Sequence, residues 1–536
     1  MADTIKTLNG IDVKGVPESL KDEVFFCVEE STVYHLQSTK INPVFFSWWA
    51  EISKQDPSLK SLVSDAEIMV AKRALFKPKI IAKALVDDNT NVKNLNDIRA
   101  LVRTVAEYGA SDMHILIGEE YTEIQIRVKG KLYVLDQVFS IKGKQLALTL
   151  FQGYTSSKDT SYQPTEVQNG QINGSDICPE YLTSIRLIHG PKYPMDRGCE
   201  FVVARFQYKD ALTRKEVTKV NKPLPLPKAS PGVDQFDAFG FTERQINKIK
   251  DYMMSSSGLI LVTGPTGSGK TTLLYEMLRS ISRRHRELRQ ITIEDPVEYP
   301  MPWAVQMAIT NAKDEESTGV AFEERLRAAL RMDPDIILVG EIRGSGSALA
   351  ALDAARTGHL VFSTMHVTDP FMCIDRMELF DPVRLNRKMT CDHRLIVGLI
   401  GTRLVPILCD HCKIPFLPEH CDERMWELLS SWHDPYSMFT VSEKGCDQCN
   451  YSGISRQQAV SEFVKTNSQC MDDFVKHGTD AARKNMRASY QDPNIQADMS
   501  MLEHVMNLVR DGKVDPHDIR HVANLITRDE ALGMGG

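Results

Sequence analysis

The apolar and polar positions of the first 95 residues are typical of a mainly helical, mixed segment. Their most apolar segment is VFFSWWAEI (44–52), whose aromatic residues predict a helix that packs into a core. A face that docks a partner is the alternative for this segment. We therefore predict that residues 1–95 form a small N-terminal domain, and we expect it to be a partner-docking domain.

Residues 96–221 change to one helix followed by strands. The helical period lies in IRALVRTVAEYGAS, and the alternation in EIQIRVKGKLYVLDQVF predicts a hairpin that turns at Lys129-Gly130. EFVVARFQY predicts a further strand. This part of the chain is therefore expected to be an α+β domain.

The Pro-rich stretch KPLPLPKASPG, within residues 222–235, has no period and predicts a semi-rigid linker. Apolar strands then alternate with helices up to about residue 408, which predicts an α/β domain over 236–536 with a largely parallel sheet. A cysteine-containing segment lies at 405–455. After it, MSMLEHVMNLVRDGKVDPHDIRHVANLI predicts a helix, a glycine turn and a second helix.

Composition excludes several classes of protein. The net charge of −7 gives no overall attraction for nucleic acid, so nucleic-acid translocation is a weak hypothesis. The N-terminus has no apolar h-region, and we find no uncharged apolar run of about 18 residues, so we expect neither a secretory signal nor a membrane span. Eleven cysteines in 536 residues do not resemble a small secreted disulfide scaffold.

The strongest local motif is GPTGSGKT, which fits G-x-x-x-x-G-K-[ST] at every fixed position. An apolar strand, LILVT, precedes it and a helical segment, LLYEMLRSI, follows it. Glycines allow a tight loop that directs backbone N–H groups at phosphate oxygens, and the helix N-terminus adds a favourable dipole. The expected nucleotide-binding residues are Gly264, Pro265, Thr266, Gly267, Ser268, Gly269, Lys270, Thr271 and Thr272. The alternative is a vestigial loop in a non-enzymatic scaffold.

Acidic residues follow two of the later apolar strands. QITIEDPVEY ends with Glu294, Asp295 and Glu298, and DPDIILVGEIR ends with Glu341 and Arg343. Parallel strands bring their carboxyl ends to the same edge of a sheet, which is also the edge of the phosphate loop. Hydrolysis of a nucleotide needs one acid to help hold Mg²⁺ and another to orient the attacking water. These two strand ends are candidates for those roles.

A third strand, in TGHLVFSTMHVTD, has His359 before it and His366 just after it. A single histidine in such a place is usually structural. Because His366 follows a strand that points to the phosphate loop, we expect it to sense the γ-phosphate.

Four cysteines form the pattern C-x₂-C…C-x₂-C: Cys409, Cys412, Cys446 and Cys449. Each pair can chelate from a tight turn, and four thiolates complete a tetrahedron around Zn²⁺. A redox-active CxxC is the alternative, but it usually occurs once, beside a thioredoxin-like βαβ unit. His411, His420 and Cys421 are nearby residues that we rank below these four as ligands.

Taken together, these motifs resemble the secretion and type IV pilus assembly ATPase superfamily. Its boxes occur in order as GPTGSGKTT, TIEDPVEY, DPDIILVGEIR and TGHLVFSTMH, and the resemblance extends over roughly residues 96–465. It implies an α/β fold class: a P-loop (RecA-like) ATPase domain, a preceding PAS-like α+β domain, a small N-terminal domain and a tetracysteine zinc insert.

The resemblance also implies roles for individual residues. Lys270 matches the family's phosphate-binding lysine, and Thr271 matches its Mg²⁺-binding hydroxyl. Glu294 matches the acid usually assigned to the catalytic water, Glu341 the acid usually assigned to Mg²⁺, and His366 the histidine of the last box. ATP, Mg²⁺ and Zn²⁺ are the implied cofactors.

In this family, arginines of the N-terminal ATPase half complete the site of a neighbouring subunit. Arg186 and Arg205 resemble that pair, although their spacing is a few residues longer than usual, so Arg127 and Arg197 stay as alternates. An arginine supplied across an interface implies a head-to-tail contact that can close into a ring. The family closes as a hexamer, and we expect a homohexamer here.

The implied function is a cytoplasmic motor at the inner face of the bacterial inner membrane. It would drive extension of a type IV pilus through a membrane platform protein and other assembly proteins, with no membrane helix of its own. The tetracysteine insert favours assembly, because retraction ATPases generally lack it. Alternatives are a type II secretion or retraction ATPase and a nucleotide-binding ring scaffold. The chain departs from the family pattern at GEIRGSGSA and IGTRLVP and resembles the type IVb pilus branch.

Overall fold

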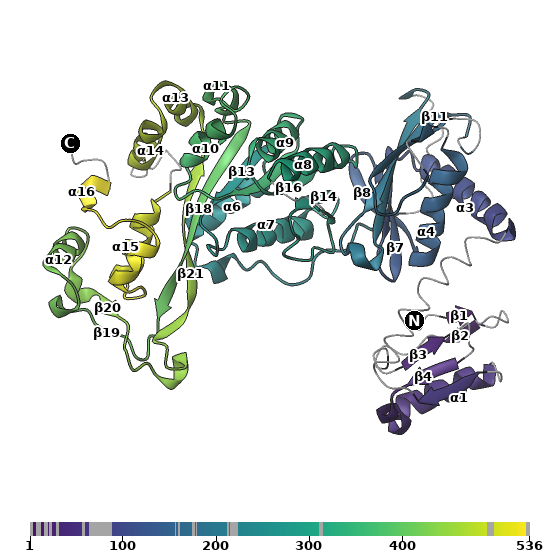
Figure 1. Cartoon of the computed structure of the whole chain (residues 1–536), viewed down its shortest axis with the longest axis horizontal. Coiled ribbons are helices and arrows are strands. Elements are labelled where there is room, and N and C mark those ends of the chain that lie inside the picture. The colour runs from purple at the N-terminus through teal and green to yellow at the C-terminus, as the bar shows by residue number, and fades with distance from the viewer. Residues whose placement is uncertain are drawn as a thin grey trace. The chain divides into compact units, whose positions relative to one another are not determined.

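The computed structural model has two compact units, Met1–Ile98 and Arg99–Gly536 (Figure 1). The dividing point lies inside one long helix, α3 Asp88–Glu107. The structure describes residues 4–6, 12–14, 20, 24–27, 32–55, 59–63, 88–155, 157–158, 161–173, 177, 179–211, 214, 223–309, 315–489 and 498–531.

The first unit is a small α/β body. Its described residues form five strands as well as α1, so the prediction that residues 1–95 are mainly helical is wrong. In its described residues β3 pairs antiparallel with β4, and β4 pairs parallel with β5. Phe45, Trp48 and Ile52 of α1 are buried, so the helix predicted at VFFSWWAEI is confirmed as a core helix. The elements are β1 Thr4–Lys6, β2 Asp12–Lys14, β3 Val24–Cys27, β4 Thr32–His35, α1 Pro43–Gln55 and β5 Lys60–Val63.

The second unit begins with an antiparallel sheet, and we name residues 99–211 the antiparallel half. The strand order is β8-β7-β6-β12-β11-β10-β9. The predicted hairpin is confirmed: Lys129 (φ 51°) and Gly130 (φ 83°) join β7 to β8, and positive φ at both positions suits a tight hairpin turn. The elements are β6 Asp112–Ile117, β7 Tyr121–Val128, β8 Lys131–Phe139, α4 Ser140–Leu148, β9 Ser157–Lys158, β10 Gln168–Asn173, β11 Leu182–Pro191 and β12 Glu200–Tyr208.

The rest of the second unit, residues 236–531, is named the P-loop half. Its main sheet has the order β15-β14-β16-β17-β13-β18-β21, with every pair parallel except the antiparallel pair of β18 and β21. The predicted, largely parallel α/β sheet is therefore confirmed. Its strands are β13 Gly258–Thr263, β14 Gln290–Glu294, β15 Val305–Ala308, β16 Ile336–Glu341, β17 Leu360–Met365, β18 Ile396–Leu408 and β21 Ile454–Lys465.

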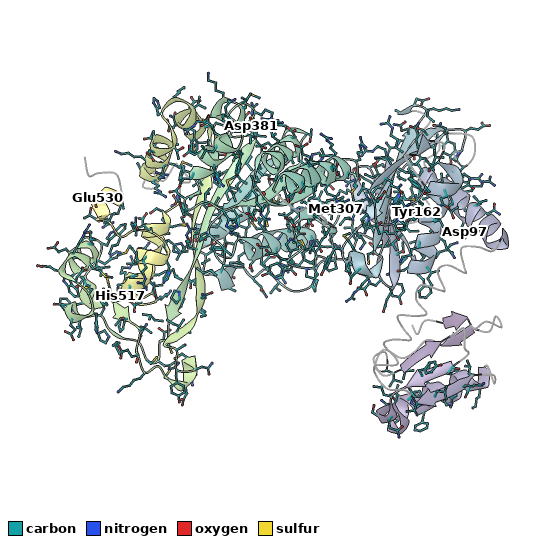
Figure 2. The ribbon with its side chains drawn as sticks, in the orientation of Figure 1. Asp97, Tyr162, Met307, Asp381, His517 and Glu530 are labelled. Atoms are coloured by element: carbon teal, nitrogen blue, oxygen red, sulfur yellow. The ribbon has the colours of Figure 1, made fainter. Side chains whose placement is uncertain are left out.

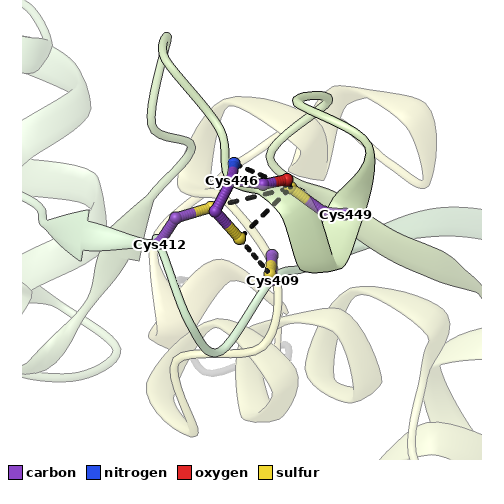
Figure 3. Close-up of side chains that lie close together, drawn as sticks. All are labelled: Cys409, Cys412, Cys446 and Cys449. Atoms are coloured by element: carbon purple, nitrogen blue, oxygen red, sulfur yellow. Dashed lines mark hydrogen bonds between the residues drawn. The ribbon is translucent and has the colours of Figure 1, made fainter.

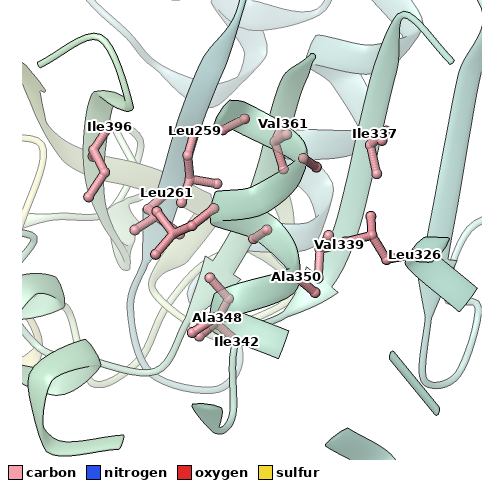
Figure 4. Close-up of a cluster of buried hydrophobic side chains, with 14 of the residues drawn as sticks. Leu259, Leu261, Leu326, Ile337, Val339, Ile342, Ala348, Ala350, Val361 and Ile396 are labelled. Atoms are coloured by element: carbon pink, nitrogen blue, oxygen red, sulfur yellow. The ribbon is translucent and has the colours of Figure 1, made fainter. Parts of the chain in front are cut away.

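Helices cover both faces of this sheet, which explains why its strands are continuous apolar runs. Leu259 and Leu261 pack with Ala348 and Ala350 of α9 on one face (Figure 4). On the other face the alternate residues of the same strands pack with α6 and α7. The helices around the sheet are α6 Glu243–Met253, α7 Lys270–Arg284, α8 Glu315–Ala329, α9 Ser345–Arg356, α10 Met372–Phe380, α11 Arg387–Thr390, α13 Ser468–Lys476 and α14 Thr479–Ala488.

A small insert stands between β18 and β21 and packs against α15. Phe416, Trp432 and Met438 of the insert share a buried cluster with Val505 of α15. After α15 the chain turns at Gly512, as predicted, but the following helix is a short 3₁₀ helix, Pro516–His521. The remaining elements are β19 Ile414–Pro415, α12 Glu423–Ser430, β20 Phe439–Thr440, α15 Met501–Arg510 and α16 Arg528–Ala531.

Figure 2 shows the side chains of both halves and labels Tyr162 and Met307. Tyr162 stacks on His189 with ring centroids 4.5 Å apart and donates to Glu200 in the antiparallel half. Met307 is buried in β15 of the P-loop half. Among the described residues, no helix combines the length and the apolar character that a membrane crossing requires.

A buried ion-pair cluster joins the two halves. Arg127 of β7 is 6% exposed, and its Nη2 lies 2.7 Å from Asp335 Oδ2 while its Nε bonds to Asp333. His114 Nε2 also lies 3.2 Å from Asp333. Both aspartates directly precede β16. Burial tends to raise the pKa of Asp333, but the hydrogen bonds and charges of His114 and Arg127 hold it below its usual value.

We expect Arg127→Met to destabilise the protein by about 3–5 kcal/mol, because it leaves two carboxylates facing a site without their guanidinium. Urea unfolding monitored by circular dichroism measures this change. Arg197→Met is the matched control, because Arg197 pairs with Glu119 on the surface of the same half. Equal shifts in the two variants would contradict a structural role for the buried cluster.

Candidate nucleotide site

The phosphate loop runs from the end of β13 to the start of α7. Three of its glycines have positive φ: Gly264 (154°), Gly267 (76°) and Gly269 (84°). A Cβ at Gly264 would lie 2.3 Å from Ser268 Oγ and 2.5 Å from the Thr402 carbonyl oxygen. Only glycine therefore fits at this corner of the loop.

Lys270 begins α7 and folds back over the loop. Its Nζ donates to the carbonyl oxygens of Gly264 (3.0 Å) and Pro265 (2.8 Å). Burial lowers the pKa of Lys270, and the negative charge of Glu341 partly opposes that shift. The ammonium of Lys270 is thus held at the loop, within reach of the charge of Glu341.

The predicted residues meet in one cavity of about 250 Å³ at the carboxyl edge of the sheet. Its lining includes loop residues from Thr266 to Thr272 together with Glu294, Glu341 and His366. The predicted loop residues Gly264 and Pro265 are not among the lining residues; their carbonyl oxygens accept from Lys270 Nζ. The cavity therefore brings together a phosphate-binding loop, two acids and a histidine.

Glu294 ends β14 and is only 4% exposed. Its Oε1 accepts hydrogen bonds from the Thr292 hydroxyl and from Gln306 Nε2 (3.0 Å). Burial raises its pKa, although these hydrogen bonds oppose the shift. A carboxylate held in this way is suited to accept a hydrogen bond from a water molecule in the cavity.

Glu341 ends β16 and lies between two nitrogen-bearing side chains. Arg343 Nε donates to its Oε2 at 2.8 Å, and His366 Nε2 lies 3.3 Å from its Oε1. Arg343 also reaches Asp295, with Nη1 3.4 Å from Oδ2. The side chains of Asp295, Arg343, Glu341 and His366 form one chain of contacts in the lining of the cavity.

The four cysteines also meet (Figure 3). Their Sγ atoms all lie within 4.8 Å of one another, and the separations are 3.7 Å for Cys409–Cys446 and 3.8 Å for Cys412–Cys449 and Cys446–Cys449. A tetrahedral zinc site with Zn–S bonds of about 2.3 Å has sulfur–sulfur edges of about 3.8 Å. The cluster therefore has the size that a structural zinc ion requires.

Backbone groups support one thiol of this cluster. The N–H groups of Cys446 (3.3 Å) and Gly453 (3.2 Å) donate to Cys449 Sγ, an arrangement that favours a thiolate ligand. His411, His420 and Cys421 are not in the cluster that the described residues form. His420 instead accepts from the backbone N–H of Leu417.

Comparison with known proteins agrees with this geometry. Residues 226–511, more than half of the chain, match the family described as "Type II/IV secretion system protein". The chain belongs to this family. The matched range contains the phosphate loop, both acids, His366 and all four cysteines.

Several relatives within this secretion-system family are similar to the chain. The type IV pilus assembly ATPase TfpB of Acinetobacter baylyi is 29% identical over 67% of this chain and 54% of its own length. The pilus assembly ATPase PilB of Thermus thermophilus is 32% identical over 48% of this chain and 27% of its own length. The type II secretion system ATPase E of Vibrio cholerae is 27% identical over 79% of this chain and 76% of its own length. The chain thus spans about half of TfpB and about a quarter of PilB.

One solved structure, of the pilus retraction motor PilT with bound ADP, overlaps 79% of this chain and 96% of that chain. The identity is 21% and the TM-score is 0.38, which is too low to carry a conclusion.

The predicted arginines lie together, away from the P-loop cavity. Arg186 and Arg205 face each other across β11 and β12, and both line a separate cavity of about 350 Å³ with Arg331. Arg205 Nε also lies 2.8 Å from Asp112. No described residue of the antiparallel half lines the P-loop cavity of the same chain. A role for either arginine in catalysis therefore requires a second chain or a movement of this half.

The two alternate arginines have other contacts. Arg127 is occupied by Asp333 and Asp335, and Arg197 Nη1 pairs with Glu119 at 2.8 Å. Both pairings are structural in this arrangement, one buried and one on the surface.

Thr364 and Tyr299 line the cavity but were not among the predicted site residues. Thr364 lies in the histidine box, and its hydroxyl donates to the Gly340 carbonyl (2.8 Å), which joins β17 to β16 beside the site. Tyr299 lines the cavity, and its hydroxyl lies 3.2 Å from that of Thr272. The position of Thr364 just before Met365-His366 is the only signal that marks it in advance.

We expect Glu294→Gln to stabilise the protein at pH 7 and above by about 1 kcal/mol, the usual size for a stabilising substitution. The folded-state pKa of Glu294 is raised, so its buried charge opposes folding above that pKa and stops doing so as acid protonates it. The gain should therefore shrink as pH falls. Urea midpoints from pH 4 to pH 8 test this; a gain that grows with acidification would contradict it.

Proposed function

We propose that this protein is an ATP-hydrolysing motor of a bacterial secretion or pilus system. The observation that carries the proposal is the single cavity that collects the phosphate loop, Lys270, Glu294, Glu341 and His366. Membership in the secretion-system family and the ATPase names of the relatives support it.

The chemistry follows from the position of each group. Loop N–H groups and Lys270 bind the phosphates of ATP, and Thr271 and Glu341 would hold Mg²⁺, which neutralises phosphate charge when bound. Glu294 orients a water molecule for attack on the γ-phosphorus, and the bond to the β,γ-bridging oxygen breaks. His366 is proposed to sense the γ-phosphate, and its contact with Glu341 supports this role.

Arg186 and Arg205 are proposed to stabilise the transition state in a neighbouring subunit. Their distance from the P-loop cavity of their own chain supports an action in trans, and a head-to-tail contact of this kind closes into a ring. We propose a homohexamer. The antiparallel half is proposed to belong to a PAS-like domain over 96–221. This domain would move against the RecA-like domain over 236–536 about the 222–235 linker.

We propose that the motor works at the cytoplasmic face of the bacterial inner membrane and extends a type IV pilus. An inner-membrane platform protein and other assembly proteins would receive its movement, with residues 1–95 as a docking domain. Type II secretion is the second candidate, because the match to ATPase E of Vibrio cholerae covers the greater share of both proteins. Cross-linking the full-length chain in cells and identifying pilins or secretion components separates the two.

We further propose that the tetracysteine cluster binds one structural Zn²⁺. Two of the thiols follow the end of β18 and two precede the start of β21, so the ion would tie both ends of the insert together. Metal binding of this type contributes on the order of 10 kcal/mol to the folding of small domains.

Phosphate release in steady state tests the motor. Lys270→Ala should lose nucleotide binding, Glu341→Gln should bind ATP without turnover, and Arg186→Ala should bind ATP with about 10³–10⁵-fold slower release. Absence of turnover in the unaltered protein at every protein concentration would favour a ring scaffold instead.

Mixing variants tests action in trans. Arg186→Ala keeps an intact phosphate loop and Lys270→Ala keeps an intact arginine, so a mixture should regain part of the activity that each lacks alone. A mixture as inactive as its components would show that Arg186 serves no neighbouring site.

We expect purified protein to contain one zinc ion per chain, which elemental mass spectrometry measures. The double variant Cys446→Ser/Cys449→Ser should lose it, because two of four ligands are gone, whereas Cys421→Ser should keep it. Two results would contradict the proposal. One is purified protein that contains no zinc, and the other is an insert whose resistance to protease does not change when a chelator is added.

A further inference from the structure

A second and larger cavity, of about 640 Å³, lies at the opposite edge of the P-loop sheet. Its lining includes residues next to the amino ends of β14 and β15, whereas the nucleotide cavity lies at the carboxyl end of β14. The antiparallel half, the linker and the P-loop half all contribute walls. Sites for small molecules commonly have volumes of about 300–1,000 Å³.

Arg289 is the most buried charge in the cavity wall. It is 3% exposed, and its Nε has no hydrogen-bond partner in the described structure. Its Nη2 donates to Gln125, and Asp335, which accepts from its backbone N–H, is paired with Arg127. A buried guanidinium N–H without an acceptor is unfavourable, and Asp333, Asp335 and Glu123, whose charges act on Arg289, leave its Nε without one.

Lys192 enters the same cavity from the antiparallel half. No hydrogen bond or ion pair of its ammonium is found among the described residues. Burial lowers its pKa, and the nearby charge of Arg289 lowers it further, while Cys199 and Glu119 act in the opposite direction. Lys192 and Arg289, whose charges act on each other, thus both line a cavity that is large enough for a ligand.

The acids of the cavity do not balance this charge. Both carboxylate oxygens of Glu119 accept from Arg197 Nη1 at 2.8 Å, whereas Glu123 accepts from the neutral Gln125 and stays as one negative charge against the four cations of the lining. Arg286 and Lys228 add two further cations to the lining. The cavity therefore carries an excess of positive charge around Lys192, Arg286 and Arg289.

One wall is aromatic. Trp303 uses its indole Nε1 to donate to Gln290 Oε1 at 3.1 Å, and Tyr193 donates its backbone N–H to Gln306 (2.9 Å). Both residues line the cavity, so flat apolar surface lies next to the cations. Aromatic rings beside basic groups suit a ligand that combines a planar ring with phosphate.

We propose that this cavity binds a small phosphate-bearing anion of nucleotide size, at a site separate from the P-loop. The ligand's phosphate pairs with Lys192, Arg286 and Arg289. Because these cations come from both halves, the bound ligand holds the halves together and opposes their relative movement. The site thereby gives the motor a means of control by a soluble phosphate compound.

Inorganic pyrophosphate is the probe, titrated calorimetrically into full-length protein saturated with ADP and Mg²⁺ so that the P-loop is occupied. We expect saturable binding tighter than about 1 mM. Lys192→Met and, independently, the exposed-site variant Arg286→Met should each weaken it about tenfold or more, as expected for loss of a charged hydrogen bond. Lys388→Met, at an exposed lysine outside the cavity, should leave it unchanged.

Hydrogen exchange supplies a second readout. Pyrophosphate should slow exchange in the 223–232 segment and around Arg289 in the unaltered protein and in Lys388→Met, but not in Lys192→Met. Absence of saturable binding, or equal affinity in Lys192→Met, Arg286→Met and unaltered protein, overturns the proposal. Since the readouts are binding and exchange, this outcome is independent of whether the protein hydrolyses ATP.

Discussion

Arg127 lies buried between the carboxylates of Asp333 and Asp335, and the packing of the two halves of the second unit depends on this pairing. The two aspartates directly precede β16, and the same strand ends at Glu341 in the nucleotide cavity. A strand of six residues spans about 20 Å. The joint between the halves and the nucleotide therefore lie at the two ends of one rigid element, and any movement of the antiparallel half has to separate buried charges first.

This arrangement assigns the two edges of the sheet to different tasks. The carboxyl edge collects the phosphate loop, two acids and His366, while the amino edge carries the ion pairs and the cationic cavity. Asp333 has φ 57°, an uncommon conformation for a residue other than glycine, at the point where Arg127 contacts it. The two cavities thus lie apart yet are connected through the same central strands.

Local patterns were sufficient to predict that the phosphate loop, both acids and His366 share one cavity and that the four cysteines form one cluster, but they gave no indication of Tyr299. The cavity residues follow parallel strands, whose carboxyl ends lie at the same edge of the sheet, and each pair of cysteines lies in one tight turn. In both cases the local pattern predicts which side chains lie close together. Arg127 shows the limit of that approach. As a sequence position it is one more strand arginine and an alternate catalytic group, because its partners lie about 200 residues away. Arg289 was missed for the same reason: burial and a missing acceptor are properties of tertiary packing, which no single-sequence pattern contains.

The length of β18 has a mechanical consequence. This strand passes the phosphate loop, where the Thr402 hydroxyl lies 3.4 Å from the Ser268 carbonyl, and seven residues later it delivers Cys409 to the metal-sized cluster. A protein that grips the insert would thus pull on the strand that forms the wall of the phosphate loop. A force applied to the insert would be transmitted along the backbone of β18 to the phosphate loop, so mechanical force and nucleotide binding would act on the same strand.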